Sequence, residues 1–483
     1  MATFHITVHG ADRAAMADIV RVHGVRVYGQ TLAERGPGFQ VDGVGDDAAI
    51  DRLRAAGYRV DRHDDVDESA QESLRHVGTG NRFAAAAPQD TQASYLNVAE
   101  VETALQAVAG PANAGFTELI TLPHITWEGR TCRAIRVHNG AAAAVGVCFL
   151  GGVHAREWGS PDILVNFVKL LTDAYRTRGG ITQGGMSLDP AKVVEIVDNL
   201  DVVVLPQANP DGRHHSMTVD PMWRKNRRPV GHGGRHCATG GGKGPGVDIN
   251  RNYDFLWDYP ARFSPDAPIQ TSTDPCSEVY NGPSAVSEPE TANVAWLLDR
   301  VPSVGYFIDV HSFGEDILYN WGDDDDQTSD PTMNFRNPAF DGKRGVADST
   351  EGGDPAGYKE YLPRTDLDEL VHLGTVMSDA IAAAHGRRYS VKGAVGLYPT
   401  SGTSDDYAYS RSFVDARKPK VRGYTIEWGP QRDSIPESFH PNYSDMVPII
   451  EEVTAGLFAF CSTVAGQLTS PQSTDAHTAV RQH

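Results

Sequence analysis

Three apolar stretches of the chain each end in side chains that bind metals or transfer protons. They are 145–150, followed by His154 and Glu157; 307–310, followed by His311; and 424–426, followed by Glu427. A histidine and a glutamate three residues apart can reach one ion together, and this combination of nitrogen and carboxylate oxygen suits zinc. A catalytic zinc takes three protein ligands and leaves one position for water, so these stretches supply a ligand set and a spare carboxylate for acid–base chemistry.

The His-x-x-Glu motif alone has a simpler interpretation, because it is frequent by chance as a surface salt bridge. The elements around it favour a site. Strand-like and helical patterns alternate between residues 93 and 466, which predicts an α/β fold with a mixed, mostly parallel sheet covered by helices on both faces. Ligands of such sheets bind outside the carboxyl ends of the strands. The expected strands include 145–150, 202–205, 306–310 and 424–426, and the expected helices include 163–175, 289–298, 367–384 and 446–460.

The remaining chain divides into three smaller parts. Residues 1–65 follow the order β-α-β-β-α-β, which predicts a small ferredoxin-like domain without catalytic residues. Residues 66–92 are rich in Asp, Glu, Gln, Gly and Ala and are interpreted as a linker. Residues 467–483 are polar and predict a flexible tail.

Composition excludes several partners. The 483 residues carry a formal net charge of −20, which disfavours nucleic acid and anionic membrane surfaces. No apolar run reaches the length of a membrane span, and a monomer is expected. The amino terminus lacks a basic region with an apolar core, so the sequence as written is expected to be cytoplasmic by default. Five cysteines are too few for a disulfide scaffold.

Further motifs accompany the three strand ends in a fixed order. They are H-A-R-E-W at 154–158, N-P-D-G at 209–212, M-W-R-K-N-R at 222–227, V-D-I-N-R-N at 247–252, P-C-S-E-V-Y-N-G at 275–282, S-E-P-E at 287–290, D-V-H-S at 309–312, Tyr398 with S-G-T-S-D-D after it, and Y-T-I-E at 424–427. Each is weak by itself, but the ordered set resembles the zinc carboxypeptidases of the pancreatic carboxypeptidase A/B type.

This resemblance implies a role for each matching residue. Zinc would be held by His154, Glu157 and His311, with Glu427 as general base and Arg224 beside the developing oxyanion. The substrate residues would be Asn250 and Arg251, which clamp the terminal carboxylate, Tyr398, which closes over the peptide, and Arg156, which lines the next subsite.

The resemblance also suggests a specificity. Asp405 lies seven positions after Tyr398, at the floor of the pocket for the C-terminal side chain in the resembling enzymes. An acid there favours Lys or Arg, and the small residues Gly402 to Ser404 leave room for apolar side chains as well. A plainer role for Asp405 or Asp406 is to cap a helix or turn.

Alternative interpretations stay open at this point. A zinc amidohydrolase or deacylase could use a similar metal site on a non-peptide amide, although Asn250, Arg251 and Tyr398 argue for a terminal carboxylate. A pseudopeptidase that only binds C-terminal tails would not need Glu427. Residues 1–65 could be an inhibitory prosegment, as in the pancreatic relatives, or an accessory module.

Two features are less specific. The acidic run Asp323–Asp326 is interpreted as a solvated loop, with a Ca²⁺ site as the alternative because oxygen ligands cluster there. Cys237 and Cys276 flank V-D-I-N-R-N as a bridged pair does in secreted members of the resembling family. Such a bridge would indicate an oxidising compartment and export, against the missing leader.

Overall fold

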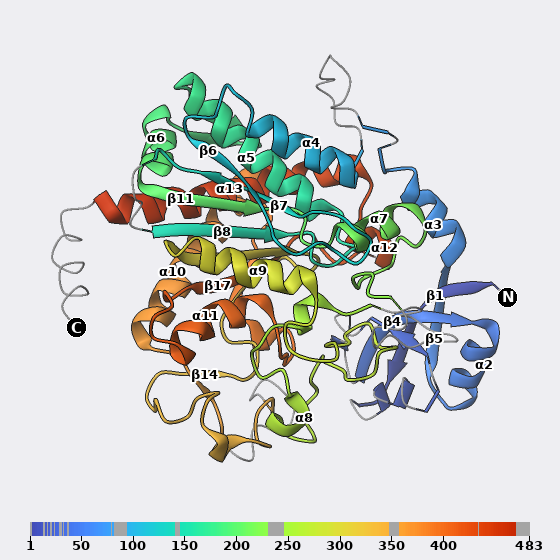
Figure 1. Cartoon of the computed structure of the whole chain (residues 1–483). Helices are drawn as coiled ribbons and strands as arrows, with labels where there is room; N and C mark the ends of the chain where they lie inside the picture. The colour runs from blue at the N-terminus through green and yellow to red at the C-terminus, as the bar shows by residue number, and fades with distance from the viewer. Residues whose placement is uncertain are drawn as a thin grey trace.

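A computed structural model of the chain describes residues 2–81, 94–140, 145–229, 246–346 and 357–469, except for scattered positions between 13 and 37 and positions 79 and 433. Figure 1 shows a large domain built on one twisted sheet and a small amino-terminal domain beside it. The catalytic motifs all fall in the large domain.

The large domain is organised around an eight-stranded mixed sheet with the strand order β16-β13-β17-β12-β8-β11-β7-β6. The strands are β6 (Thr117–Thr121), β7 (Arg133–Val137), β8 (Val145–Gly151), β11 (Leu200–Leu205), β12 (Val304–His311), β13 (Asp316–Tyr319), β16 (Ser390–Gly393) and β17 (Arg422–Glu427). The four central strands β11, β8, β12 and β17 run parallel, whereas β6, β7 and β13 join through antiparallel pairs. The carboxyl ends of the four parallel strands therefore share one edge, as predicted.

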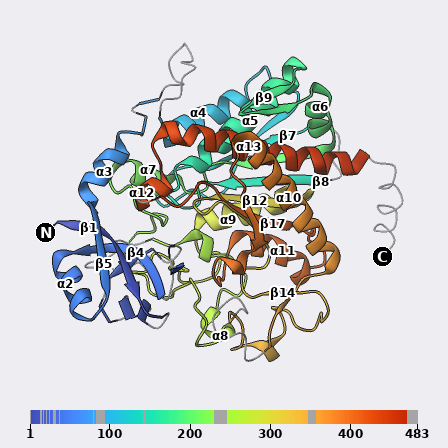
Figure 2. The same cartoon turned by 180° about the vertical axis from the view of Figure 1, so that it is seen from behind.

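Both faces of the sheet are covered by helices, which confirms the predicted fold class. Alternate residues of β8 enter two separate cores: Val147 and Phe149 pack on one face, and Cys148 and Leu150 on the other. The first face is covered by α4 (Val98–Val108), α5 (Gly159–Thr177), α6 (Pro190–Asn199), α10 (Arg364–His385) and α13 (Tyr443–Thr469). The second is covered by α9 (Pro289–Arg300) and α11 (Ser404–Val414). Figure 1 shows α9 and α11 in front of the sheet, and Figure 2 shows α10 and α13 on the opposite side.

The carboxyl-terminal helix corrects one expectation from the sequence. The segment Ile435–Leu468, which covers α12 (Ile435–Phe439) and nearly all of α13, is long and apolar enough to cross a membrane, and its most apolar window has a mean hydropathy of 1.4. However, 67% of its most apolar window is buried inside the protein, where α13 packs against α5, α6 and α10. The same apolar composition is required of a helix that fills a large core, and this is the environment in which the segment lies.

The amino-terminal domain contains the antiparallel sheet β2-β4-β1-β5, with β3 paired to β4. Its elements are β1 (Thr3–Gly10), β2 (Arg26–Val27), β3 (Ala33–Arg35), β4 (Gly38–Asp46), α2 (Asp47–Ala55) and β5 (Arg59–Asp65). Asp46 caps α2 by accepting a hydrogen bond from the backbone N–H of Ala49 at 2.7 Å. The first helix of the predicted β-α-β-β-α-β order, expected over 11–22, includes positions outside the described residues, so the ferredoxin-like assignment stays a prediction.

The predicted linker and tail are partly helical where the structure describes them. The linker begins with α3 (Val66–Leu74), whose first turn is capped by Asp65, and residues 82–92 lie outside the described part of the chain. Helix α13 continues to Thr469, and the positions after it are not among the described residues.

Shorter elements complete the large domain. They are the hairpin β9 (Ile181–Gln183) and β10 (Met186–Leu188), the pair β14 (Asp326–Gln327) and β15 (Glu360–Tyr361), the helices α7 (Pro210–Thr218) and α8 (Tyr259–Arg262), and the 3-10 turns Ile249–Arg251, Pro338–Phe340 and Ala394–Gly396.

Candidate active site

The three predicted metal ligands come from the ends of two adjacent parallel strands. His311 is the last residue of β12, and His154 and Glu157 lie in the turn between β8 and α5. This turn begins at Gly152, whose φ of 63° lies in the left-handed region that favours glycine, and a Cβ there would stand 3.0 Å from the carbonyl oxygen of Pro206. The glycine thus allows the chain to leave the strand and present both side chains at the sheet edge.

The ligand atoms of these residues converge to within 4.8 Å of one another. His154 Nδ1 lies 2.7 Å from Glu157 Oε1, and His311 Nδ1 lies 3.0 Å from both Glu157 Oε2 and His154 Nδ1. All three side chains are buried. Although burial opposes ionisation, His154 and His311 hold the pKa of Glu157 below its ordinary value.

Each of the two imidazoles has a carboxylate next to its Nε2 atom. These carboxylates indicate which ring nitrogen carries the proton and which one is free to bind a metal. His154 Nε2 lies 3.2 Å from Asp248 Oδ1, and His311 Nε2 lies 2.9 Å from Asp309 Oδ2. These contacts favour the proton on each Nε2, so that both Nδ1 lone pairs point toward one another and toward Glu157. Converging lone pairs and a carboxylate need a cation between them. The donor set fits zinc.

Arg224 and Asp248 form a buried ion pair beside the ligands. Arg224 Nε donates to Asp248 Oδ2 at 2.9 Å, and its Nη1 lies 4.0 Å from Glu157 Oε1. Burial alone would lower the pKa of Arg224, but Asp248 and Glu157 raise it, so the guanidinium is permanently charged. Asp248 therefore fixes both a histidine ligand and the cation next to it.

Glu427 ends β17 and lines the same cavity as the ligands. Burial raises its pKa to about 8, and the nearby carboxylates Glu157 and Asp316 act in the same direction, whereas His311 and Arg224 oppose the shift. A bound divalent cation would favour the ionised form. The position and chemistry of this carboxylate suit a group that takes and returns a proton.

The predicted clamp residues line the same cavity. Asn250 and Arg251 occupy the 3-10 turn Ile249–Arg251, where the Asn250 Oδ1 accepts from the Ser404 N–H at 2.8 Å. Arg251 donates from Nε to the Gln270 carbonyl oxygen at 2.6 Å, which aligns its guanidinium. Tyr398 lines the same cavity, and its pKa is raised by burial and by Glu427, with Arg251 opposing the shift.

One side chain fastens two of the loops that build the site. Asn209, from the N-P-D-G motif, caps α7 and donates from Nδ2 to the carbonyl oxygens of Val153 at 3.0 Å and Lys225 at 3.2 Å. The first carbonyl precedes His154 and the second follows Arg224. Asn209 therefore connects the loop that carries the metal ligand His154 to the loop that carries Arg224, and it fixes the distance between them.

Two predicted substrate residues do not line this cavity. Asp405 is 3% exposed and lies behind it, accepting from Thr425 Oγ1 at 3.1 Å. Arg156 is 1% exposed; its Nη1 donates to Glu278 Oε2 at 2.9 Å, and its guanidinium lies 5.4 Å from the centre of the Tyr28 ring. The other predicted site residues line the cavity, with the exception of His311. His311 contacts two of the lining residues, His154 and Glu157.

The amino-terminal domain packs in one apolar cluster with a residue that lines the cavity. Tyr28 and Val44 pack in one apolar cluster with Met222, Phe313, Ile435 and Phe439, and Phe313 also lines the active-site cavity. Gln431 donates to Asp42 Oδ2 at 3.4 Å, and His440 Nε2 lies 3.0 Å from Ser73 Oγ. The cavity itself has a volume of about 30 Å³, which is room for about one water molecule.

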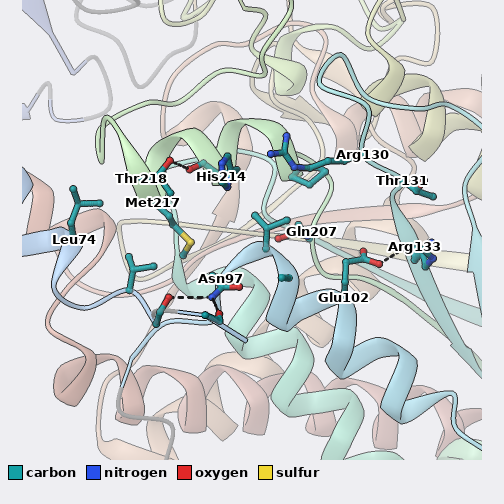
Figure 3. Close-up of a pocket in the computed structure, with 16 residues that line it drawn as sticks. Leu74, Asn97, Glu102, Arg130, Thr131, Arg133, Gln207, His214, Met217 and Thr218 are labelled. Carbon is teal, nitrogen blue, oxygen red and sulfur yellow. Dashed lines mark hydrogen bonds and ion pairs between the residues drawn. The ribbon is translucent and has the colours of Figure 1, made fainter. Parts of the chain in front are cut away.

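A larger cavity of about 730 Å³ lies elsewhere, between α3, α4 and α7 (Figure 3). Its walls include Leu74 of α3, Asn97 before α4, and His214 and Met217 of α7, and it is bounded by an ion pair between Arg133 and Glu102. None of the converging ligand atoms reaches it. Its size alone does not make it the catalytic site.

The acidic loop 323–326 does not support the alternative interpretation as a Ca²⁺ site. Within the described residues, only His154, Glu157 and His311 bring three such ligand atoms together. Asp323 is fully buried, and its pKa is raised by burial and by its neighbours Glu360 and Asp324. This corrects the expectation of a solvated loop, because burial and the neighbouring carboxyl groups both disfavour the ionised form of the Asp323 carboxyl.

Sequence reasoning missed Asp248, Asp309 and Tyr28. Asp248 lies inside a recognised motif, and Asp309 interrupts an apolar strand two residues before His311, which places both side chains on one face. A buried acid in a central strand was the available clue. The sequence around Tyr28 contains no pattern that would have predicted its contact with the large domain.

Comparison with known proteins identifies the class. The model of the zinc carboxypeptidase family, peptidase family M14, matches residues 105–456. The chain belongs to this family of zinc-dependent hydrolases with C-terminal exopeptidase activity.

Among individual relatives, the chain is similar to carboxypeptidase B of Astacus astacus, with 27% identity over 368 residues, or 75% of this chain and 95% of the relative. It is 29% identical to carboxypeptidase B of Homo sapiens over 288 residues, which span 59% of this chain and about half, 53%, of the human protein. Two solved structures share the fold at a TM-score of 0.67: thrombin activatable fibrinolysis inhibitor (17% identity, 96% of this chain and 100% of that chain) and carboxypeptidase A from Helicoverpa armigera (21%, 97% and 98%).

Proposed function

We propose that this protein releases single C-terminal amino acids from peptides or proteins, with a preference for Lys and Arg. The observation that supports this most directly is the placement of Asn250, Arg251 and Tyr398 in the same cavity as His154, Glu157 and Glu427. A pocket for a terminal carboxylate beside a metal-binding centre defines which peptide bond is within reach.

The proposed roles follow from the chemistry of each group. Zinc held by His154, Glu157 and His311 would activate water and polarise the scissile carbonyl. Glu427 takes the proton from the attacking water and later gives it to the leaving amine, so it must be ionised at the start of each cycle. Arg224, charged and fixed by Asp248, stabilises the negative charge that develops on the carbonyl oxygen, a contribution commonly worth about 3–4 kcal/mol.

The terminal carboxylate of the substrate is bound by Arg251 together with Asn250. A guanidinium presents two parallel N–H groups to a carboxylate, which gives both affinity and orientation. The backbone contacts of Arg251 to Asn250 and Gln270 hold this fork in place, with Nη1 donating to the Asn250 carbonyl oxygen at 2.6 Å. Tyr398 closes over the bound residue.

The preference for basic side chains rests on Asp405. Its carboxylate is buried at the start of α11, where Thr425 Oγ1 and the Asp406 N–H donate to it, and a cation would compensate such a buried acid further. A Lys or Arg side chain that enters the pocket would supply the cation. The alternative role as a helix-terminal acid is compatible with its place in the first turn of α11.

A peptide panel that differs only in the last residue tests the proposal. Release of Lys and Arg should exceed release of Leu and Phe, be lost with phenanthroline and return with zinc. Equal or faster release of Leu and Phe would refute the basic preference. Hydrolysis of amides that lack a free terminal carboxylate, at rates comparable with peptides, would favour the alternative of a zinc amidohydrolase or deacylase.

We also propose that residues 1–65 shield the site. Tyr28 packs in one apolar cluster with Phe313, which lines the cavity, and the cavity volume of about 30 Å³ is too small for an amino-acid side chain. Cleavage within 75–92 should therefore raise activity toward peptides.

The variant Tyr28→Ala should activate the uncleaved protein, whereas Arg59→Ala, an exposed change on the same domain, should not. Equal activity before and after cleavage would show that the domain is an accessory module.

The disulfide bond at Cys276 favours an oxidising compartment, and we propose that the protein is exported and acts there as a monomer. Cys132, Cys148 and Cys461 are free, and Cys237 lies outside the described residues. Localisation of the full-length product by fractionation tests export, and its mass in solution tests the monomer.

A further inference from the structure

A buried carboxylate in the centre of the sheet has no role in the proposed reaction. Asp309 lies in β12, two residues before His311, so both side chains point to the same face of the strand. It is fully buried, and a charge in such a position is costly unless specific partners compensate it. Its partners therefore indicate why an acid is tolerated there.

The partners of Asp309 connect the metal centre to the substrate pocket. Asp309 Oδ2 forms an ion-pair contact with His311 Nε2 at 2.9 Å and accepts from Ser404 Oγ at 2.6 Å. Ser404 begins α11, and its backbone N–H donates to Asn250 Oδ1 at 2.8 Å. A continuous path thus leads from a metal ligand through Asp309 and Ser404 to a clamp residue.

We propose that Asp309 is a positioning residue that holds His311 in the orientation needed to bind zinc and, through Ser404, ties that orientation to the placement of Asn250. The proposal rests on the proposed zinc site. Carboxylates that contact the far nitrogen of a ligand histidine fix its ring and raise its basicity. Asp248 Oδ1 lies 3.2 Å from the same nitrogen, Nε2, of His154, so each histidine ligand has its own carboxylate.

Zinc affinity can be measured by competition with a chromogenic chelator. This measurement distinguishes a residue that positions a metal ligand from one that only stabilises the fold. Asp309→Asn keeps the size of the side chain and should raise the zinc dissociation constant about 10- to 100-fold. The unfolding temperature of the metal-free protein should change little. The matched control is Asp201→Asn in strand β11, which β8 separates from β12; Asp201 is a buried acid bound to Arg136 and Ser303. This control should lower the metal-free unfolding temperature and leave zinc affinity unchanged.

A zinc affinity within twofold of the wild type in Asp309→Asn would overturn the proposal. If that variant does not fold, Ser404→Ala retains the carboxylate and removes only the link. It should weaken zinc binding by at least twofold and raise KM for peptides more than it lowers kcat. Unchanged zinc affinity and KM in Ser404→Ala would likewise overturn the proposal. Since zinc binding is measured without substrate, a failure of the proposed peptidase activity would be recognised separately.

Discussion

His440 makes the stability of the protein depend on pH in a way that can be calculated. Its ring is 2% exposed, stacks on Trp158 at a centroid distance of 4.2 Å, and lies between the Arg156 carbonyl oxygen and Ser73 Oγ. Burial lowers its pKa to about 3, and the nearby positive charge of Arg156 acts in the same direction. The unfolded chain, by contrast, protonates this residue near pH 6.5.

The direction in which stability changes with pH follows from this difference in pKa between the folded and unfolded states. Above pH 6.5 the ring is neutral in both states, and its contribution to stability is complete. Between pH 6.5 and about 3 only the unfolded state gains the proton, so stability falls as the pH falls. At pH 5 the interval of about 1.5 pH units corresponds to a loss of about 2 kcal/mol.

Urea unfolding at pH 7.5 and pH 5.0, followed by tryptophan fluorescence, measures this loss. His440→Gln can still donate to the Arg156 carbonyl and accept from Ser73, and its decrease in unfolding free energy should be about 2 kcal/mol smaller than that of the wild type. His372→Gln, an exposed change on α10, should behave like the wild type. If His440→Gln loses as much stability as the wild type, the ring does not stay neutral in the folded protein.

Three further predictions concern catalysis and substrate binding. Glu427→Gln should retain zinc by metal analysis, while kcat falls about 10²- to 10⁴-fold; turnover within tenfold of the wild type would contradict the assigned base. Arg251→Lys keeps the charge but loses the fork, and KM should rise about 10- to 100-fold, the equivalent of about 1.5–3 kcal/mol for a hydrogen bond to a charged group. An unchanged KM would remove Arg251 from the clamp. Gly402 has a φ of 66°, and a Cβ there would lie 2.3 Å from the Arg251 carbonyl oxygen, so Gly402→Ala should lower Tm and raise KM together. The control Gly386→Ala also has a positive φ but no atom within 4 Å, and it should lower Tm without changing KM.

The metal centre could be predicted from the sequence because its ligands follow from strand position. Parallel strands end at a common edge, so His311 and Glu427 at the ends of apolar runs had to lie near the His154 motif. The register confirms this, since His311 and Glu427 are direct partners across β12 and β17. Local pattern and topology were sufficient here.

Contacts between distant side chains could not be predicted in the same way. Alternation along β12 places Asp309 on the face of His311, but only the folded chain shows that Ser404, 95 residues later, is its other partner. The contact of Tyr28 with the large domain depends on how two domains pack. Similarly, the run 323–326 has the composition of a solvated loop, and its burial became visible only with Glu360 packed beside it.

The order of strands in the sheet has a consequence for how the protein is made. Strand β17 (Arg422–Glu427) leaves the ribosome after the other seven strands of the eight-stranded sheet, yet it lies between β13 and β12 near the middle of that sheet. Until it is synthesised, β12 has an unpaired edge, and the face covered by α13 stays open. At about 5–20 residues per second, translation leaves that edge exposed for several seconds after β12 and β13 have emerged. The catalytic centre is therefore completed only after the last strand of the sheet has been synthesised, because Glu427 ends that strand.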